Sequence, residues 1–215
     1  TGRKSATKAS AGKTPRVHYQ ERRTTLQSYQ IQDLKDFMKK LLLTETFDAF
    51  LLSEASVTTY AAFHLDGSIH PDYFSTDEAE TLTTEQCGYV LWKRVRPLFF
   101  ELMKGKNTPL SFQIVFRLAQ YNVESLLRQS GLSYRAEDVD GLFLTLRYDG
   151  TQLSCISGSS LRIFTLDHSL DHAWDAMLEK FFHKKEIVVS HEAYGYLCKD
   201  YGLTQIGVKG VNAET

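Results

Sequence analysis

The sequence predicts an α+β domain in which antiparallel hairpins and meanders pack against several helices. Three observations lead to this expectation. Asp-Gly dipeptides follow two segments rich in β-branched and aromatic residues, as is typical of tight hairpin turns. Segments with apolar residues at helical spacing stand in separate blocks from these hairpins. The composition, 42% hydrophobic and 24% charged, is that of a globular chain and excludes a disordered or collagen-like polymer.

The first residues form a basic segment. Residues 1–30 contain seven basic side chains and one acidic side chain, whereas the remaining residues carry 18 basic and 25 acidic side chains. The first sixteen residues have no large apolar side chain to bury. Because such a segment cannot offset its chain entropy, we expect residues 1–28 to form a disordered basic tail. The tail lacks the interleaved aromatic residues that are typical of proteins that bind specific nucleic-acid sequences, so no specific nucleic-acid partner is expected.

One helix and a strand pair are expected at the start of the central domain. Apolar residues recur at steps of three and four from Ile31 to Leu42, which predicts a helix with one apolar face. The next segment predicts strands near 48–54 and 57–65 that end at the Asp66-Gly67 turn. A short extended piece is expected near 69–74.

A second helix is expected after residue 83. Thr83 and Gln86 match a capping box, in which each side chain bonds the backbone N–H of the other residue. The apolar residues that follow share one helical face. Pro97 interrupts this run and predicts a kink or a break near Arg96.

A strand and a short helix come next. Apolar and polar residues alternate over 111–118, which predicts a half-buried strand. Asn122 is expected to cap a helix that continues to Gln129, and Gly131 suits the position after its end.

Residues 141–166 contain the clearest strand pattern. Alternation up to the Asp149-Gly150 turn predicts one strand, and two further strands are expected over 152–157 and 161–166. A Gly158-Ser159-Ser160 turn is expected to separate these two strands. A helix with one apolar face then follows over 169–183.

The last thirty residues predict a different arrangement. Segment 186–190 is expected to form a buried strand, 191–201 a compact helix and 204–208 another short strand. This β-α-β order requires a parallel sheet. We therefore divide the chain into the tail 1–28, an α+β domain over 29–186, and an appendage over 187–215.

The central domain resembles a known family. Segments 35–42, 47–52 and 164–167, together with Tyr148-Asp149-Gly150 and Ser157-Gly158-Ser159-Ser160, are similar to a family of small uncharacterised bacterial proteins, a domain of unknown function. This resemblance covers residues 29–186 and implies a fold but no activity.

The appendage resembles a second family. Segments 190–197 and 201–205 are similar to the zinc and manganese solute-binding proteins of metal ABC importers. In that family the histidine after the strand is a metal ligand, so the resemblance implies His191 as a ligand and zinc as a possible cofactor. We interpret the segment as a fragment of such a receptor joined to an unrelated domain. The alternative is a helix-capping sequence that is similar by convergence.

Other histidines have two interpretations. His168 and His172 lie four residues apart at a predicted helix start, so both imidazoles could face one metal ion. Alternatively, they belong to an acid-rich helix N-terminus that complements the helix macrodipole. His64 and His70 flank the first Asp-Gly turn, where turn and edge positions account for them.

Cysteine usage and hydropathy predict a cytoplasmic protein without a membrane span. Cys87, Cys155 and Cys198 are odd in number and widely spaced, so neither a disulfide framework nor a Cys-x-x-Cys metal clip is expected. No apolar run approaches the length of about 18 residues that a membrane helix needs. Cys155 is expected to be a buried small hydrophobic residue.

Three classes of function follow. A non-catalytic binding or interaction domain leads, because no catalytic constellation stands out, and exposed aromatic residues could serve a protein partner. A zinc-binding protein centred on His191 is the second class. An enzyme whose site forms only in three dimensions is the third. No catalytic residue is assigned.

Overall fold

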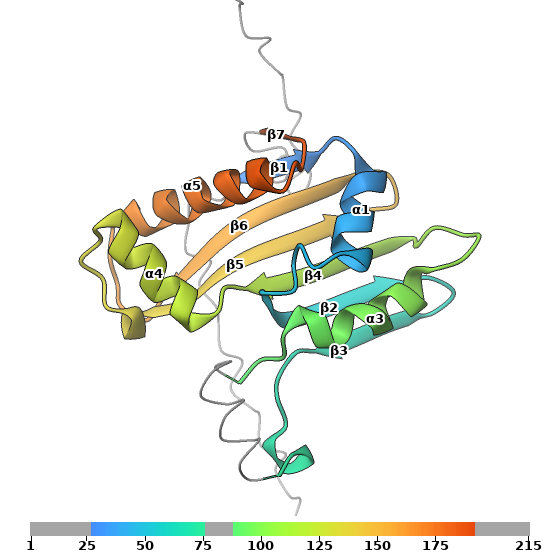
Figure 1. The fold of residues 1–215 in the computed structure, drawn as a ribbon, viewed down its shortest axis with the longest axis horizontal. Helices are drawn as coiled ribbons and strands as arrows, with labels where there is room; N and C mark the ends of the chain where they lie inside the picture. Colours follow the sequence, from blue (N-terminus) through green and yellow to red (C-terminus); the bar gives the residue numbers. More distant parts are fainter. Residues whose placement is uncertain (1–26, 76–87, 192–215) are drawn as a thin grey trace, which may run out of the picture.

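The computed structural model describes residues 27–75 and 88–191. Within them, one seven-stranded sheet has the order β3-β2-β4-β5-β6-β1-β7, and every neighbouring pair is antiparallel. Figure 1 shows this sheet behind a layer of helices. The strands are β1 (Ser28–Ile31), β2 (Leu51–Thr58), β3 (Ala62–Asp66), β4 (Ser111–Arg117), β5 (Val139–Tyr148), β6 (Leu153–Leu161) and β7 (Val189–His191).

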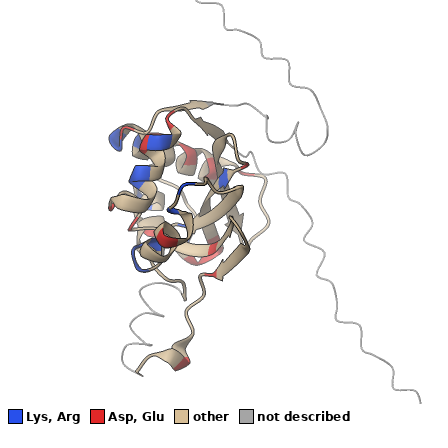
Figure 2. Ribbon diagram, turned by 90° about the vertical axis from the view of Figure 1, so that its right-hand side faces the viewer, with Lys and Arg blue, Asp and Glu red and all other residues tan. Residues whose placement is uncertain are grey.

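Helices lie on one face of the sheet, which confirms the α+β class. Helix α5 runs along β6, and α1 packs against α3. Figure 2 shows the helices on one side of the sheet, with Lys and Arg mainly along them. The helices are α1 (Leu34–Leu43), α3 (Trp92–Met103), α4 (Gln120–Ser130) and α5 (Ser169–Lys184), with short 3-10 turns η1 (Pro71–Tyr73) and η2 (Ala136–Asp138).

The core lies between these helices and the sheet. Along β4, Phe112, Ile114 and Phe116 are buried, while the residues between them face the other side. Two buried tryptophans connect helices to backbone oxygens. The indole of Trp92 donates to Leu41 O (3.0 Å), and that of Trp174 donates to Phe143 O (3.0 Å). Their polar atoms are thus satisfied inside an apolar layer.

Several predicted elements are confirmed. The first helix is α1, and its N-cap Asp33 accepts a hydrogen bond from Asp36 N (2.9 Å). Ile31, predicted as part of this helix, belongs instead to β1, a strand that the apolar spacing did not predict. Helix α5 and strand β4 lie within one residue of their predicted bounds. Gly131 ends α4 with a left-handed backbone (φ 63°), which glycine adopts without strain.

The predicted bounds of the first hairpin are wrong. Its strands are β2 and β3, and its turn lies at Thr59–Ala61, where Thr59 N donates to Ala61 O (2.9 Å). Glu54, Ala55 and Ser56 have low strand propensity, so the pattern predicted a break there. The strand continues through them because β3 and β4 pair with β2 on both sides. The piece predicted as extended near 69–74 contains the 3-10 turn η1 instead.

The predictions of a turn at Gly158-Ser159-Ser160 and of a separate strand over 161–166 are also wrong. Strand β6 continues through Gly158, Ser159 and Ser160 to Leu161, because β5 supplies a partner for each of them, and no strand forms over 162–166. Phe143 pairs with Gly158, and Gly141 pairs with Ser160. A complete ladder is favoured over a local turn, since each paired backbone group is satisfied.

Two helix starts differ from the predictions. Helix α4 begins at Gln120, and its N-cap is Ala119 rather than Asn122. Helix α3 begins at Trp92, because Val90 accepts a backbone bond from Leu52 (2.8 Å) in an extended conformation. Pro97 lies within α3. The capping box at Thr83 and Gln86 lies outside the described residues.

The C-terminal strand β7 was expected to lie in a parallel sheet, and this prediction is wrong. It pairs antiparallel with β1, with Tyr29 opposite His191. Backbone bonding begins before the strand, where Gln32 N donates to Val188 O (3.0 Å), and the adjacent Ile187 is buried. The helix expected over 191–201 and the strand over 204–208 lie outside the described residues. The division of the chain at residue 186 therefore remains a prediction.

The described residues contain no helix long and apolar enough to cross a membrane. Cys155 is fully buried, as expected, and burial raises the pKa of its thiol. A protonated, inaccessible thiol is a poor nucleophile.

The ion pair between Asp48 and Arg96 is expected to stabilise the fold. Arg96 Nη2 donates to Asp48 Oδ2 (3.0 Å), and Arg96 Nε lies 2.9 Å from Oδ1, which joins α3 to the turn before β2. Both side chains are largely buried. We expect Arg96→Met to lower the free energy of unfolding by about 3 kcal/mol, because Asp48 keeps a buried charge without a partner. Urea unfolding measures this loss.

The exposed pair Arg135 and Glu137 gives the matched control. Both side chains are at least 70% exposed, so Arg135→Met should leave the unfolding midpoint unchanged. Equal effects of the two substitutions would contradict the role assigned to the buried pair.

Candidate functional site

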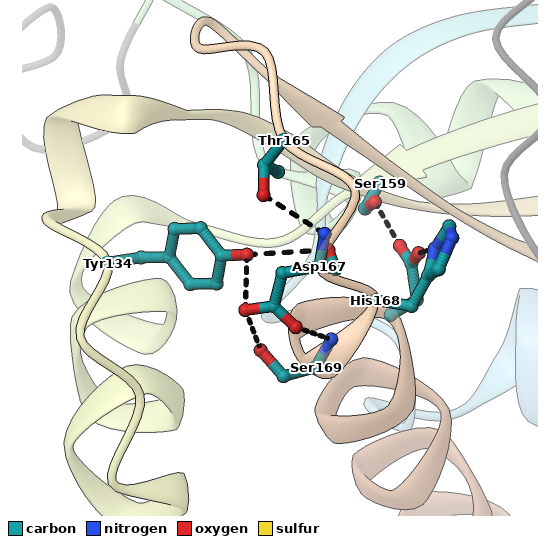
Figure 3. Close-up of polar contacts among 7 residues, drawn as sticks. Tyr134, Ser159, Thr165, Asp167, His168 and Ser169 are labelled. Carbon is teal, nitrogen blue, oxygen red and sulfur yellow. Dashed lines mark hydrogen bonds and ion pairs between the residues drawn. The ribbon is translucent and has the colours of Figure 1, made fainter.

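The predicted histidines His168 and His172 lie at the N-terminus of α5. Figure 3 shows the polar cluster around His168. Asp167 accepts hydrogen bonds from Ser169 N (2.9 Å) and from the Tyr134 hydroxyl (2.8 Å). Asp167 N in turn donates to Thr165 Oγ1 (3.0 Å). These contacts fix the loop between β6 and α5 against the segment before η2.

A serine, a carboxylate and a histidine meet in this cluster. Asp171 accepts a hydrogen bond from the Ser159 hydroxyl, and its other oxygen lies 2.9 Å from His168 Nδ1. In a nucleophilic triad the histidine stands between serine and carboxylate, and it takes the serine proton. Here the carboxylate stands in the middle. The order fits a structural connection between α5 and β6, with Asp171 nearly buried.

A second carboxylate lies one turn further along α5. Burial raises the pKa of Asp175 above its ordinary value, and the neighbouring charge of Asp171 adds to this effect, while a hydrogen bond from Ser157 opposes it. Tyr29, which is fully buried, lies with its hydroxyl 3.4 Å from Asp175 O, and its pKa is also raised by burial. Polar groups thus run along the contact between α5 and β6.

Within the described part of the chain, the predicted metal ligands lie at α5 and in β7 and do not form a common site. His172 is exposed on α5, and His168 is engaged with Asp171. His191 lies in β7, paired with β1. No group of three or more His, Cys, Asp and Glu side chains capable of holding a metal ion occurs in residues 27–75 and 88–191.

A second candidate site lies on the sheet face away from the helices. There a hollow of about 620 Å³ opens over β2, β3 and β4. Its floor includes Ser56 on β2, with His64 and Gln113 as the cross-strand partners of Ser56 on either side. The lining residues are Ser53, Glu54, Ala55, Ser56, His64, Leu65, Asp66, Ser68, Tyr89 and Gln113.

The wall of the hollow depends on a tight backbone crossing. The segment after β3 turns back over β2, where Gly67 N donates to Ser53 O (3.0 Å) and Gly67 O accepts from Val90 N (2.9 Å). A Cβ at Gly67 would lie 1.9 Å from Leu52 O, so only glycine permits this approach. The strand register of β2 shifts between Leu52 and Glu54, as in a β-bulge. The crossing and the bulge together place Glu54 at the wall.

Tyr89 forms the aromatic side of the hollow. It is bridged to Ser68 through the backbone. The guanidinium of Arg117 lies 5.0 Å from the Tyr89 ring centroid and 5.6 Å from that of Phe143. Arg117 also donates a hydrogen bond to Asp140 O. These contacts hold the tyrosine ring in place through cation–π attraction.

Two carboxylates meet at the rim. Glu54 and Asp66 are direct cross-strand partners on β2 and β3, and both are exposed. Like charges at such positions repel each other. Hydrogen bonds from the Ser68 side chain and backbone, the latter at 2.8 Å, lower the pKa of Asp66, so the carboxylate stays ionised. The rim of the hollow therefore carries negative charge, while the guanidinium of Arg117 lies against the Tyr89 ring.

Two family models match parts of the chain. The model of a family of unknown function, DUF5721, matches residues 40–190. The chain belongs to this family. A second model, zinc-uptake complex component A, periplasmic, matches residues 167–215. Both resemblances inferred from the sequence are confirmed. Neither a curated protein nor a solved structure matches the chain.

The two matches overlap over residues 167–190. In the DUF5721 fold this overlap contains α5, whose Trp174, Leu178 and Phe182 are buried in the core, and the start of β7. The residues that resemble the zinc-uptake component are thus in part structural elements of the DUF5721 domain.

Sequence reasoning missed the hollow in the DUF5721 domain. His64 and Asp66 were assigned to a turn, and Glu54, Tyr89 and Gln113 are far apart in the chain. The available signal was a run of alternating polar residues on β2 and β3, which indicates only that one sheet face lacks an apolar cover.

The polar cluster at the N-terminus of α5 is also expected to contribute to stability. We expect Asp171→Ala to lower the free energy of unfolding by about 2 kcal/mol, because Ser159 and His168 lose their shared partner in a nearly buried position. Asp72→Ala, at an exposed acid in η1, serves as the control. Thermal unfolding followed by circular dichroism measures both. An unchanged melting temperature for Asp171→Ala would contradict the structural role.

Proposed function

We propose that this DUF5721 protein is a non-catalytic binding domain whose hollow takes a small organic cation. The opposed carboxylates of Glu54 and Asp66, at the rim of an open hollow, carry the proposal. A ligand ammonium or guanidinium group between them relieves their repulsion and replaces it with attraction.

The size and lining of the hollow support a small-molecule ligand. Its volume of about 620 Å³ lies within the range of roughly 300–1,000 Å³ that such sites occupy. Ser56 and Gln113 offer hydrogen-bonding groups to the body of the ligand, and Tyr89 offers an aromatic surface. Arg117 lies beside the Tyr89 ring and positions it.

Two nucleophile candidates outside the hollow, Ser159 and Cys155, do not form a catalytic arrangement. The Ser159 hydroxyl donates to a carboxylate instead of a histidine, and Cys155 is buried with a raised thiol pKa. Neither group meets the requirement of an activated nucleophile beside a base.

A five-carbon series with different end groups tests the ligand class. We expect cadaverine to bind in the hollow, and pentanediol and glutarate to bind more weakly or not at all, because only cadaverine carries positive charge. Glu54→Gln and Asp66→Asn should each weaken cadaverine binding by about threefold, as is usual for exposed charges. NMR titration measures the affinities and locates the shifted resonances.

Asp72→Asn provides the matched control. It removes one exposed acidic charge outside the lining residues, so the affinity should stay at the level of the unaltered protein. Equal binding of cadaverine and glutarate, or shifts remote from the hollow, would overturn the proposal. Added salt should weaken the interaction through screening.

Zinc binding through His191 is the second candidate, favoured by the match over residues 167–215. The side chains described do not by themselves provide a site, so further ligands would have to come from other parts of the chain. We expect equilibrium dialysis to show bound zinc at micromolar concentration, and His191→Ala to lose it, because imidazole is the donor that the resemblance assigns.

His70→Ala is the control for zinc binding, since His70 is an exposed histidine outside the segment 167–215 that resembles the zinc-uptake component. A full-length chain that takes up no zinc would exclude this candidate and leave the organic-cation proposal unaffected.

A further inference from the structure

We propose that two copies of the chain pair through β3 and form a continuous antiparallel sheet. The contact lies at the edge of the sheet and does not depend on ligand binding in the hollow. In the described part of the chain, β3 pairs with β2 on one side only. An unpaired strand edge presents backbone donors and acceptors to another strand.

The hydrogen-bond pattern identifies which backbone groups of β3 point outward. Gly67 N donates to Ser53 O, and Thr59 N donates to Ala61 O, at the two ends of the hairpin. Bonded pairs alternate along an antiparallel ladder, so the odd-numbered residues of β3 direct their backbone groups to β2. The outward N–H and C=O groups therefore belong to Ala62, His64 and Asp66.

These outward groups are complementary to themselves. A two-fold axis at His64 places His64 opposite His64 of the partner subunit, and Ala62 opposite Asp66 of the partner subunit. Each of the resulting pairs is a hydrogen-bonded pair, and all residues of β3 take part. A shift of the register by two residues would leave part of the strand unpaired.

The side chains agree with this register. On the core side, Phe63 faces Leu65 of the partner subunit, and both residues are only partly covered in one copy. On the other side, Asp66 lies opposite the small Ala62 of the partner subunit and diagonal to its His64. The arrangement avoids direct contact between two acids.

Charge on an edge strand usually hinders pairing. In this register Asp66 has a histidine as its diagonal neighbour, which limits that effect. The strand is short, so its interface is small, and we expect a weak dimer whose population rises with protein concentration.

The outward N–H of His64 makes the test specific. Proline lacks an N–H, and it is tolerated on an edge strand where that group faces solvent. We expect the unaltered chain to approach twice the monomer mass of 24.5 kDa in sedimentation equilibrium as the concentration rises. His64→Pro should stay monomeric, whereas His64→Thr, which keeps the N–H, should still dimerise.

Cross-linking provides a second measurement that does not depend on proline. In a chain with Cys87→Ser and Cys198→Ser, we expect His64→Cys to form a covalent dimer with a short bifunctional thiol reagent, because the paired Cα atoms would be about 5.5 Å apart. Ser56→Cys is the matched control, since Ser56 lies directly opposite His64 on the inner strand β2.

A folded chain that stays monomeric up to its solubility limit would overturn the proposal. So would a dimer that is insensitive to His64→Pro and does not cross-link through His64→Cys, because its interface would lie elsewhere. Cross-linking of Ser56→Cys as readily as of His64→Cys would overturn the proposed register.

Discussion

Helices cover one face of the sheet, so successive side chains of β4 and β5 meet two different environments. Phe116 packs among aromatic rings from α3 and from the turn before β2, whereas Gln113 lies in the hollow on the opposite face. The period of two residues in an extended strand imposes this separation. The same alternation that buries the core also places polar side chains in a row on the other face, where the hollow opens.

The helical layer is fixed by polar contacts as well as by apolar packing. Trp92 and Trp174 each donate to a backbone oxygen, and Asp171 connects α5 to β6. Hydrophobic burial is non-directional, so it holds helices on the sheet without fixing their position along it. Directional hydrogen bonds and the ion pair of Asp48 with Arg96 fix the position of the helices along the sheet.

The sequence predicts correctly the helices and strands that show a local apolar pattern. The predictions are wrong where a strand depends on pairing partners that are distant in the chain. Helix α1 and strand β4 follow directly from their apolar spacing. The course of β6 through Gly158 depends on partners in β5, and the direction of β7 depends on the open edge of β1. The hollow could not be predicted for the same reason, since the Gly67 crossing brings Glu54 and Tyr89 together across a long stretch of chain. Apolar spacing and the separate blocks of strands and helices were sufficient to predict the fold class, because the class requires only one apolar face on each element.

Strands β1 and β7 are the first and last strands described, and they are neighbours in the sheet. Tyr29 near the start of β1 lies opposite His191 at the end of β7. A force applied to Ser28 and His191 would load the ladder between these strands one pair at a time, beginning at this end. Such a zipper geometry resists extension far less than strands pulled in shear, in which all the bonds share the load. Mechanical unfolding would therefore begin with the release of β7, while the central strands remain paired.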